Sequence, residues 1–534
     1  MMEHPTNSND TEDARRRIAD LLDARGEWFC GVLDHGRRGH RASAPVALRK
    51  GEWEVSTSNA SLLFSAWSEL GTRLWRVTGW EWTGEKLLLE ATRRMGAERA
   101  TLELVPRASA SAALMALTAA RLAAAERLSK LSRAMVGAGT QVERMGLSTG
   151  ARRGEPGRYA RIVLQTRGGG RVAVTGPVAD LRRHEVDSFL ASALLWSFRI
   201  GDRKTNSHPT PLWLIVTHAT ASAVGERLTL LREALRRDIA LYEVDEAREN
   251  LAPASTPELR DLLRADTARF KRPARVVVSG LAERIVALDP EAVDVVRAGH
   301  GETLRFRGLA FARVRRVGDG EHLWFGVDGA RRRRLLDESS WPQLLKLIEE
   351  LSEHRRADAR DERHALYKNA PEAWLESLLR RDITRLDPGL IISPLHAQFR
   401  TSQTDAPSGA RPIDLLALRR DGRLVVIELK ATEDITLPLQ GADYWRRVET
   451  HRRAGGIART NLFGDAMIAD EPPLVYLVAP TLRFHRAFDT LAHAVSPDIE
   501  MYRFDINEDW RAGVRVMRRV CANQIAPDPA SGVF

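Results

Sequence analysis

The chain has 534 residues, of which 43% are hydrophobic and 28% are charged, and these proportions are typical of a folded protein with several domains. Lys and Arg outnumber Asp and Glu by 81 to 71, an excess that favours a partner rich in phosphate groups. The only cysteines are Cys30 and Cys521, which excludes a disulfide framework and a zinc site built from clustered cysteines.

Several other classes of protein are disfavoured by what the sequence lacks. It has no H-E-x-x-H zinc motif, no Walker phosphate-binding loop and no G-x-G-x-x-G nucleotide fingerprint. The polar N-terminus has no apolar segment of the kind found in signal peptides. No uncharged apolar run reaches the length of a membrane span. We therefore expect a cytoplasmic protein without a membrane partner.

The first quarter of the chain predicts a short helix followed by a β-rich module. Residues 1–13 are predicted to be a disordered tail, and Ala14–Ala24 a short helix, so that the two together fill residues 1–24. Short apolar runs separated by glycine-containing turns predict the β-rich module over residues 25–107. The module contains Trp75, Trp80 and Trp82. Such aromatic residues beside arginines could stack on nucleic-acid bases, but we favour the interpretation that they form the core of a small barrel.

Residues 109–250 predict a long helix followed by an α/β domain. The helix covers Ser109–Met135, and its apolar heptad spacing is interrupted by a charge at Arg121, which favours a packing helix over a coiled coil. A hairpin pattern follows at 159–174. The next predicted elements are a helix (Glu185–Phe198), a strand (Pro211–Thr217), a helix (Gly225–Arg237) and a strand (Ile239–Val244).

A linker composed of Ala, Pro, Ser and Thr at residues 252–257 leads into a second β-rich module over 256–355. Its predicted strands lie within Ala274–Leu336 and include 284–289.

The same module contains a run of arginines, Arg331–Arg334, that could clamp phosphate but is more often a solvated turn. It ends with an amphipathic helix at Trp341–His354. The charged stretch Arg355–Arg363 is predicted to be a joint before a last domain at 361–525.

The most informative segment is Pro412–Lys430, which predicts two apolar strands joined by a polar Asp-Gly turn. Alternation puts Glu428 and Lys430 on one face of the second strand and Leu429 on the other, and the turn brings Asp414 level with Glu428. Two carboxylates about 4 Å apart repel by roughly 4 kcal/mol at an effective dielectric of 20. A divalent cation with oxygen ligands would remove that repulsion, and a nearby ammonium group could orient a metal-bound water.

This hairpin resembles the active-site hairpin of the PD-(D/E)XK nuclease superfamily, and most closely the NucS-type and RecB-like endonuclease domain, over residues 361–520. The proline stands one place earlier than in the nominal motif, so that Ile413 precedes Asp414. Three flanking segments are also similar to the family. They are the Q-x-x-x-Y element from Gln440 to Tyr444 at the start of a predicted helix (Leu439–Arg453), a first helix at Pro371–Leu379, and a buried strand at Pro473–Thr481.

The resemblance implies a multidomain α+β protein with a C-terminal restriction-endonuclease-like α/β core, in which helices flank a mixed central sheet. It also implies an Mg²⁺- or Mn²⁺-dependent DNA endonuclease, whose upstream modules would select the substrate. The metal ligands would be Asp414, Glu428 and the Leu429 carbonyl, and Lys430 would position the attacking water. Substrate binding would fall to Gln440, Tyr444 and Arg447.

Some alternatives remain open at this stage. Glu372 is the preferred first-helix acid to complete the site, because it lies at the edge of the apolar stripe, but Glu376 on the wetter side competes for that role. The chain could instead be a non-catalytic nucleic-acid-binding or defence-scaffold protein with a nuclease-like fold. The sequence does not distinguish DNA from RNA as the partner and does not reveal the oligomeric state.

The order of elements after the hairpin at 159–174 matches that of the C-terminal domain. When Gly170 and Arg171 are aligned with the turn residues Gly422 and Arg423, Gly176 corresponds to Glu428 and Val178 to Lys430. Ile162 or Arg161 then corresponds to Asp414. We therefore predict a degenerate second nuclease-like core that has lost its metal ligands.

Overall fold

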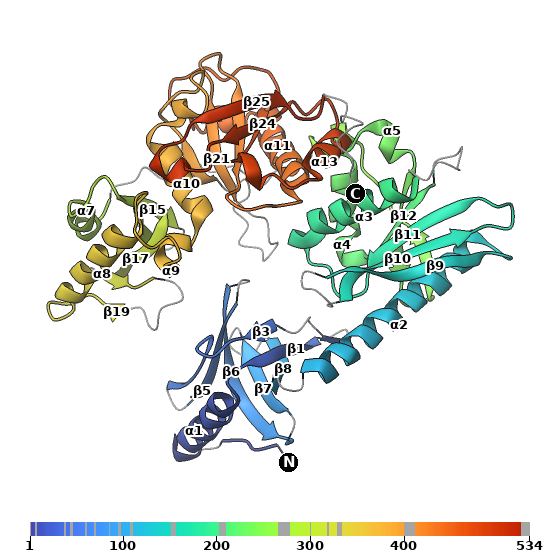
Figure 1. Cartoon of the computed structure of the whole chain (residues 1–534), viewed down its shortest axis with the longest axis horizontal. Coiled ribbons are helices and arrows are strands. Elements are labelled where there is room, and N and C mark those ends of the chain that lie inside the picture. The colour runs from blue at the N-terminus through green and yellow to red at the C-terminus, as the bar shows by residue number, and fades with distance from the viewer. Residues whose placement is uncertain are drawn as a thin grey trace. The chain divides into compact units, whose positions relative to one another are not determined.

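The structure is a computed structural model that describes residues 2–5, 8–36, 39–42, 46–58, 61–68, 71–84, 86–93, 98–106, 110–150, 156–201, 210–264, 278–298, 301–317, 320–327, 334–399 and 412–524. The chain divides into two compact units, one of Met1–Leu181 with Asp245–Leu251 and one of Arg182–Val244 with Ala252–Phe534. Both units mix helices and sheets (Figure 1). Within the described part of the chain, no helix combines the length and the apolar character that crossing a membrane requires.

The first unit begins with a helix packed on an antiparallel sheet. The sheet comprises β1 (Trp28–Gly36), β2 (Gly39–Ala42), β3 (Val46–Leu48), β4 (Trp53–Ser58), β5 (Ser61–Ser68), β6 (Gly71–Trp82), β7 (Leu87–Arg93) and β8 (Glu98–Pro106). Its strand order is β2-β1-β8-β7-β6-β5-β4, and β3 pairs with β1. Helix α1 (Ser8–Arg25) packs on β4 and β5 and begins earlier than predicted, so residues 8–13 are not a disordered tail. The reason is local, because Glu12 lies one turn before Arg15 and accepts a hydrogen bond from it.

The tryptophans of this module form its core, as predicted. Trp75 and Trp80 are each 3% exposed and belong to one hydrophobic cluster, against which Trp82 packs. Arginine side chains lie over all three rings, Arg93 on Trp75, Arg17 on Trp80 and Arg25 on Trp82. Each ring is therefore covered from within the protein.

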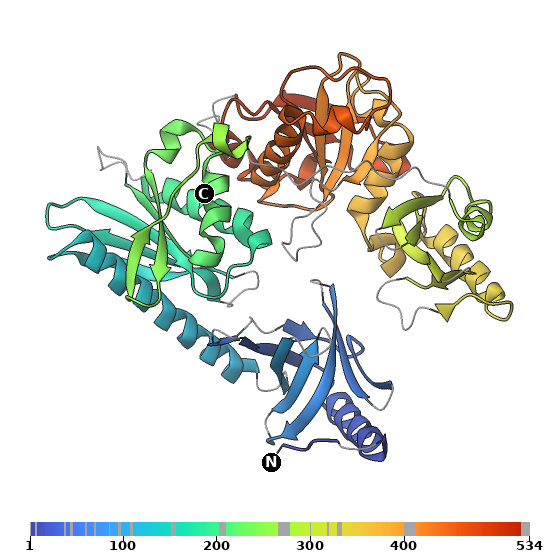
Figure 2. The same ribbon diagram turned by 180° about the vertical axis from the view of Figure 1, so that it is seen from behind.

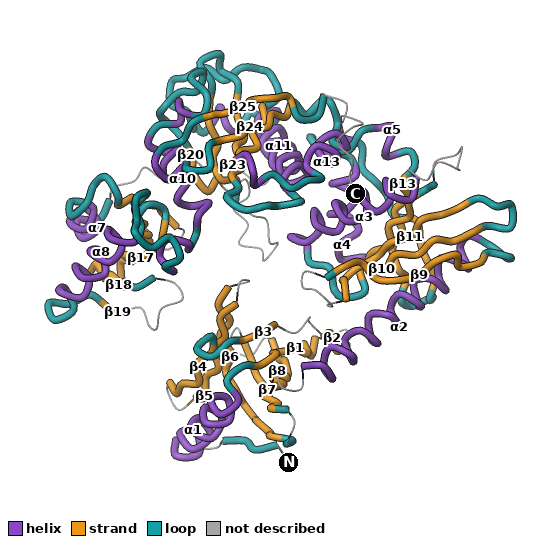
Figure 3. Tube along the Cα trace, viewed as in Figure 1, coloured by secondary structure: helices purple, strands orange, loops and turns teal. Residues whose placement is uncertain are grey.

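The rest of the first unit is one long helix beside three antiparallel strands. Helix α2 (Ala110–Val136) matches the predicted helix closely and packs along β9 (Gln141–Thr149) and β10 (Pro156–Gln165) (Figure 3). Strand β11 (Arg171–Pro177) completes the predicted hairpin with β10.

The second unit begins with alternating helices and strands. They are a 3-10 turn (Arg183–Glu185), α3 (Val186–Gly201), β12 (Leu212–Thr217), α4 (His218–Leu228), α5 (Glu233–Arg236), β13 (Ile239–Asp245) and β14 (Asn250–Pro253). Strands β12 and β13 are parallel. The single helix predicted at Gly225–Arg237 is wrong, because a turn at Thr229 and Leu230 ends α4 and Leu231 pairs with Val495 in an antiparallel bridge before α5 begins.

A small antiparallel sheet follows, in the order β15-β16-β17-β18-β19. Its strands and flanking helices are α6 (Leu259–Leu262), α7 (Gly280–Val286), β15 (Val293–Ala298), β16 (Gly301–Phe306), β17 (Leu309–Val317), β18 (Gly320–Phe325), β19 (Arg334–Leu335) and α8 (Trp341–His354). The strand predicted at 284–289 is wrong, because the Ser279 hydroxyl accepts the N–H of Ala282 and so caps helix α7. Of the arginine run, residues 331–333 lie outside the described residues.

The segment predicted as a joint, Arg355–Arg363, is mostly exposed, but its first residue is anchored in the interior. Arg355 is fully buried, and its guanidinium donates hydrogen bonds to five backbone carbonyls and stacks on Trp374. The carbonyls belong to Phe306, Arg307, Leu366, Asn369 and Ala370. These acceptors satisfy the cation, which is why a charge is tolerated there.

The C-terminal part is a six-stranded mixed sheet in the order β20-β21-β22-β23-β24-β25. Its elements are α9 (Ala365–Lys368), α10 (Pro371–Arg381), a 3-10 turn (Ile383–Arg385), β20 (His396–Phe399), β21 (Ile413–Leu418), β22 (Leu424–Leu429), α11 (Leu437–Arg453), α12 (Gly456–Arg459), β23 (Leu474–Pro480), a 3-10 turn (Thr481–Arg483), α13 (Phe488–Ala494), β24 (Met501–Ile506), a 3-10 turn (Trp510–Ala512) and β25 (Val516–Cys521). Strands β22, β23 and β24 are parallel, and β20, β21 and β25 are antiparallel to their neighbours.

Helices cover both faces of this sheet, with α10 on one side and α11 on the other (Figures 1 and 2). Each face has its own core. Leu415, Ile427 and Leu429 pack with Trp374 and Leu375 of α10 on the first face. Leu416, Leu424 and Val426 pack with Tyr444 and Val448 of α11 on the second. The alternation predicted from the sequence is therefore present, and it directs Asp414 and Glu428 to the α11 face.

Candidate active site

The β21–β22 hairpin has the register that its sequence predicts. Leu415 pairs with Ile427, so one step further along the same register Asp414 lies across from Glu428. The turn requires Gly422, whose φ is +84° and whose missing Cβ would lie 2.6 Å from the Met467 carbonyl oxygen. Two carboxylates from adjacent strands are thereby held side by side.

Asp414 is fixed by hydrogen bonds to both of its oxygens. Its Oδ2 accepts the backbone N–H of Leu429 at 2.9 Å, and its Oδ1 accepts Nε2 of Gln398 at 3.3 Å. Burial raises the pKa of Asp414, although these donors and Lys430 oppose the rise. The carboxyl group therefore sits where a nearby cation would stabilise its ionised form.

Glu428 is 1% exposed and has two unlike oxygens. Oε1 accepts a hydrogen bond from Lys430 Nζ at 2.7 Å, whereas the buried Oε2 has no hydrogen-bond donor in the described part of the chain. Burial and the neighbouring Asp414 raise the pKa of Glu428 well above its usual value. A buried acceptor that lacks a donor is costly, and a divalent cation between the two acids would satisfy it, so the residues present fit such an ion.

Lys430 completes this group from the end of β22. Besides Glu428, its ammonium lies 3.5 Å from Asp434. Burial would lower the pKa of Lys430, but these two carboxylates outweigh burial and raise it. The side chain is therefore charged at neutral pH and held beside the acid pair.

The two candidate acids of the first helix are placed differently. Glu376 is 2% exposed, contrary to the expectation that it lies on the wetter side of the helix. Gln398 of β20 and Arg305 of β16 cover it, at 2.7 Å and 3.6 Å from its carboxylate oxygens. Glu372 is less buried and turns instead to the backbone N–H of Ala431, 3.3 Å away.

Gln398 was not singled out from the sequence, yet it links an acid of the hairpin to an acid of helix α10. Its Nε2 donates both to Glu376 and to Asp414. Its φ of +49° is unusual for a residue with a side chain, and such positions cluster at functional sites. Burial raises the pKa of Glu376, and Asp414 adds to that rise, so the two acids are close enough to interact. No sequence signal marked Gln398, since the short strand β20 was not predicted.

Helix α11 forms the wall facing the acids. Nε2 of Gln440 donates to the Tyr444 hydroxyl at 2.8 Å, and the Arg447 guanidinium lies 5.1 Å from the centre of the Tyr444 ring. The Oε1 atom of Gln440 is buried without a hydrogen-bond partner among the described residues. Burial raises the pKa of Tyr444, and Glu428 and Asp414 add to the rise. The three residues predicted to bind substrate thus lie together beside the acid pair.

Asp414 and Glu428 alone offer few ligands to a metal ion. Within the described ranges, no three His, Cys, Asp or Glu side chains are grouped closely enough to hold a metal ion by themselves. An ion bound by Asp414 and Glu428 would therefore take further ligands from backbone oxygens, water or substrate, as hard cations commonly do.

Searches with the sequence find no matching family model and no matching curated protein. Similar solved structures include EndoMS in its apo form (13% identity, TM-score 0.12, covering 40% of this chain and 88% of that one). They also include an EndoMS complex with double-stranded DNA (12% identity, TM-score 0.14, 41% and 89%). A third is a repair endonuclease from Pyrococcus abyssi (9% identity, TM-score 0.12, 40% and 88%). These TM-scores are too low for the likeness to assign an activity to this chain.

Proposed function

We propose that this protein is an Mg²⁺- or Mn²⁺-dependent DNA endonuclease that hydrolyses phosphodiester bonds at the Asp414–Glu428–Lys430 group. The observation that carries the proposal is the buried Oε2 of Glu428, which lies beside a second carboxylate and has no hydrogen-bond partner among the residues that the structure describes. The basic composition of the chain suits an anionic partner. A protein that only gripped nucleic acid would gain nothing from two acids directed at a phosphate backbone.

Asp414 and Glu428 would hold the ion, with the Leu429 carbonyl as a third ligand and Glu376 or Glu372 acting directly or through water. When bound, the ion activates a water molecule and stabilises the charge that develops on the scissile phosphate.

The chain's own groups would perform the remaining tasks. The Lys430 ammonium would donate a hydrogen bond to the attacking water and so fix its position. Gln440 and Arg447 would hold the DNA backbone near the cut, with the guanidinium as a planar donor to phosphate. Because water is excluded around Glu428, these interactions would be stronger than on an open surface.

The experiment combines ion binding with cleavage. Wild-type protein, Asp414→Asn and, as the matched control, Asp465→Asn are melted with and without Mn²⁺ and incubated with a panel of single-stranded, duplex, branched and mismatched DNA. Asp465 is an exposed acid in the same domain. We expect Mn²⁺ to raise the Tm of the wild type and of the control, by the equivalent of about 2.7 kcal/mol at a hundredfold excess over Kd, but not that of Asp414→Asn.

In the same panel the wild type and Asp465→Asn should cut at least one substrate, while Asp414→Asn should be slower by about a thousandfold, because ion stabilisation of this kind contributes several kcal/mol. Unaltered cleavage by Asp414→Asn would refute the site. If no DNA is cut under any condition, the proposed activity is wrong.

A further inference from the structure

The core of the nuclease-like domain occurs twice in the chain. In the C-terminal copy, the antiparallel strands β20, β21 and β22 are followed by α11, β23, α13 and a strand β24 parallel to β23. In the earlier copy, the antiparallel strands β9, β10 and β11 are followed by α3, β12, α4 and a strand β13 parallel to β12. Each copy is also preceded by an antiparallel sheet and at least one helix, α2 before the earlier copy and α8, α9 and α10 before the C-terminal one.

The earlier copy has no acid pair at the corresponding hairpin. In β10 and β11, Ala160 pairs with Gly176 and Arg161 with Thr175. Whichever of these two pairs corresponds to Asp414 and Glu428, neither contains a carboxylate. This replaces the expectation that Ile162 or Arg161 lies at the Asp414 position opposite Gly176, since Ile162 pairs with Val174 and Arg161 with Thr175. The observed register places Ala160 there.

Within the second unit, the equivalent helices of the two copies contact each other reciprocally. Helix α3 of the earlier copy packs on α11 and on α13. In return, α4 of the earlier copy contacts α11 through Arg227 and Asp443. Helix α3 corresponds to α11, and α4 corresponds to α13. Exchanging the two copies therefore turns the contact of α3 with α13 into the contact of α11 with α4. Such reciprocity is the mark of an isologous, twofold interface.

The chain segments that follow the two equivalent helices also pair with each other. Leu231, after α4, forms an antiparallel bridge with Val495, after α13. The N–H of Arg232 donates to the Ala494 carbonyl at 2.9 Å, and the N–H of Ser496 donates to the Leu230 carbonyl at 2.8 Å. An antiparallel bridge between equivalent segments is itself locally twofold, which agrees with the arrangement of the helices.

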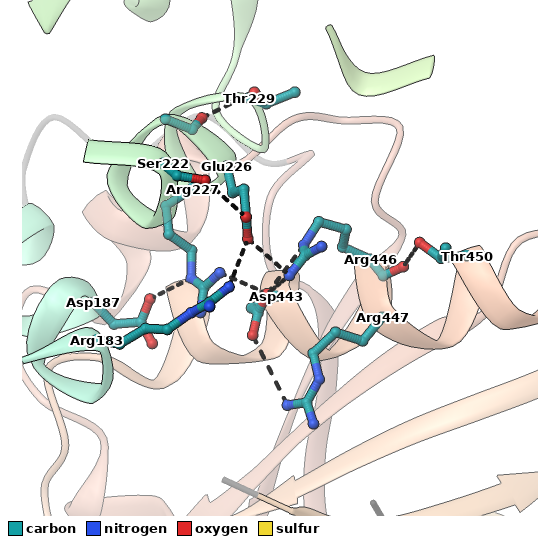
Figure 4. Close-up of polar contacts among 11 residues, drawn as sticks. Arg183, Asp187, Ser222, Glu226, Arg227, Thr229, Asp443, Arg446, Arg447 and Thr450 are labelled. Atoms are coloured by element: carbon teal, nitrogen blue, oxygen red, sulfur yellow. Dashed lines mark hydrogen bonds and ion pairs between the residues drawn. The ribbon is translucent and has the colours of Figure 1, made fainter. Parts of the chain in front are cut away.

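Buried charges fix the contact (Figure 4). The Arg227 guanidinium lies between two carboxylates, with Nε 2.8 Å from Asp187 and one terminal nitrogen 2.7 Å from Asp443. Arg446 of α11 in turn reaches Glu226 of α4 at 3.3 Å. The side chains of all five residues are no more than 16% exposed, so the ions are paired away from solvent and any mismatch would be costly.

We propose that the chain is an internal pseudo-dimer. The C-terminal core carries the cutting site, and the earlier core, which lacks the acid pair, occupies the surface to which the C-terminal core of a second chain would otherwise bind. The functional consequence, which rests on the function proposed above, concerns the product. One molecule has one cutting site, and the surface that would recruit a second cutting core is already filled. The protein therefore acts on duplex DNA as a single-chain enzyme that nicks one strand in each binding event.

The test uses the full-length chain. Its mass is measured by light scattering across a range of concentrations. The cleavage substrates are supercoiled plasmid and any panel duplex that the wild type cuts, with each strand of the duplex labelled separately. Products are followed at less than one cut per DNA molecule. We expect the mass of one chain, open-circular plasmid ahead of linear, and labelled products from one strand per duplex. Linear plasmid formed as fast as open circle, or a stable dimer, would overturn the pseudo-dimer.

The pairing itself has a readout independent of cleavage. Arg227→Ala, Asp443→Ala and the double variant are compared by thermal unfolding with the same cycle at the exposed ion pair of Arg237 and Glu233. We expect the double variant at the interface to lose clearly less Tm than the two single losses combined, and the exposed pair to be nearly additive. Additive losses at Arg227 and Asp443 would refute the contact.

Inactivity on all DNA would count against the proposed function, while the mass and the unfolding cycle would still decide the pairing. If the protein cuts only single strands, the nicking claim is wrong even where the pairing stands.

Discussion

At the scale of single residues, the site depends on how few donors its acids have. One oxygen of Glu428 accepts from Lys430 and the other has no donor within the described ranges, while Asp414 is held by one backbone N–H and one side-chain amide. Acids whose charge was already fully balanced by protein donors and cations would bind an ion weakly. Two acids with incomplete hydrogen bonding and raised pKa values retain it.

The first-helix acids provide a test at this scale. Glu376 shares Gln398 with Asp414, whereas Glu372 contacts only the segment after Lys430 among the bonds described for it. We expect Glu376→Gln to slow cleavage by about tenfold to a hundredfold, because a hydrogen bond to a charged group contributes roughly 1.5–3 kcal/mol. Glu372→Gln should have the smaller effect. Initial cleavage rates of the two variants measure the difference, and the reverse order would restore Glu372 to the role.

The positions of Asp414, Glu428 and Lys430 followed from the sequence because β alternation and an Asp-Gly turn fix register locally. Glu376 and Gln398 did not follow. Glu376 is covered by Arg305, which is 71 positions earlier in the chain. A helical wheel describes only the helix itself, so it cannot anticipate a partner from another sheet.

At the scale of elements, Arg355 joins helix α8 to α10 and to the β16–β17 turn. A change to Ala would remove the side-chain donor from the carbonyls of Phe306, Arg307 and Leu366. We expect Arg355→Ala to lower the free energy of unfolding by about 3 kcal/mol or more, since each such group costs about 1–3 kcal/mol. The neighbouring Arg356, exposed and paired with Asp358, is the control, and Arg356→Ala should lower the free energy of unfolding much less, because exposed ion pairs contribute little. Chemical denaturation of both variants measures the two losses. Equal losses would contradict the stabilising role of the Arg355 hydrogen bonds.

The contact between α4 and α11 predicts a dependence on pH. Burial would raise the pKa of Asp443, but Arg227, Arg446 and Arg447 outweigh burial and lower it well below its usual value. The folded state therefore binds this proton less readily than the unfolded state, so the stabilisation is complete above about pH 5 and is lost as the pH falls through the unfolded pKa of about 3.9 towards the lower folded pKa. The loss for this group is at most about 1.4 kcal/mol for each pH unit.

Asp443→Asn removes that titration. Its free energy of unfolding should be lower than that of the wild type at pH 7 and should fall less steeply below about pH 4. Denaturation curves at a series of pH values compare the two slopes, and parallel slopes would contradict the assignment to Asp443.

Helices with strong local signals were found from the sequence, as α8 and α2 illustrate. The errors have physical causes. The polar start of α1 reads as disorder until Arg15 is seen to pair with Glu12. The sequence from Gly225 to Arg237 predicts one helix, but Leu231 pairs with Val495, which is remote in the sequence, and this pairing interrupts it. Elements fixed by distant partners are the ones that a local pattern misses.

At the scale of the whole molecule, pairing two cores within one chain makes their association independent of protein concentration, because the partner is always tethered nearby. We expect the cleavage rate per molecule, at saturating DNA, to be unchanged when the protein is diluted from micromolar to nanomolar. Initial rates over this range measure it. A fall with dilution would indicate that separate chains must associate, contrary to an internal pair.

The β16–β17 turn has a consequence for dividing the protein into fragments. Gly308, with φ +83°, lies so close to α10 that an added Cβ would meet the Ala373 carbonyl oxygen at 1.9 Å. From the adjacent strand, Arg305 reaches Glu376. A fragment that starts at α10 would therefore expose the surface of α10 that Gly308 contacts. It would also remove Arg305, the counter-charge of the buried Glu376. We therefore expect the smallest fragment that keeps the Asp414–Glu428 site folded to begin upstream of the small sheet.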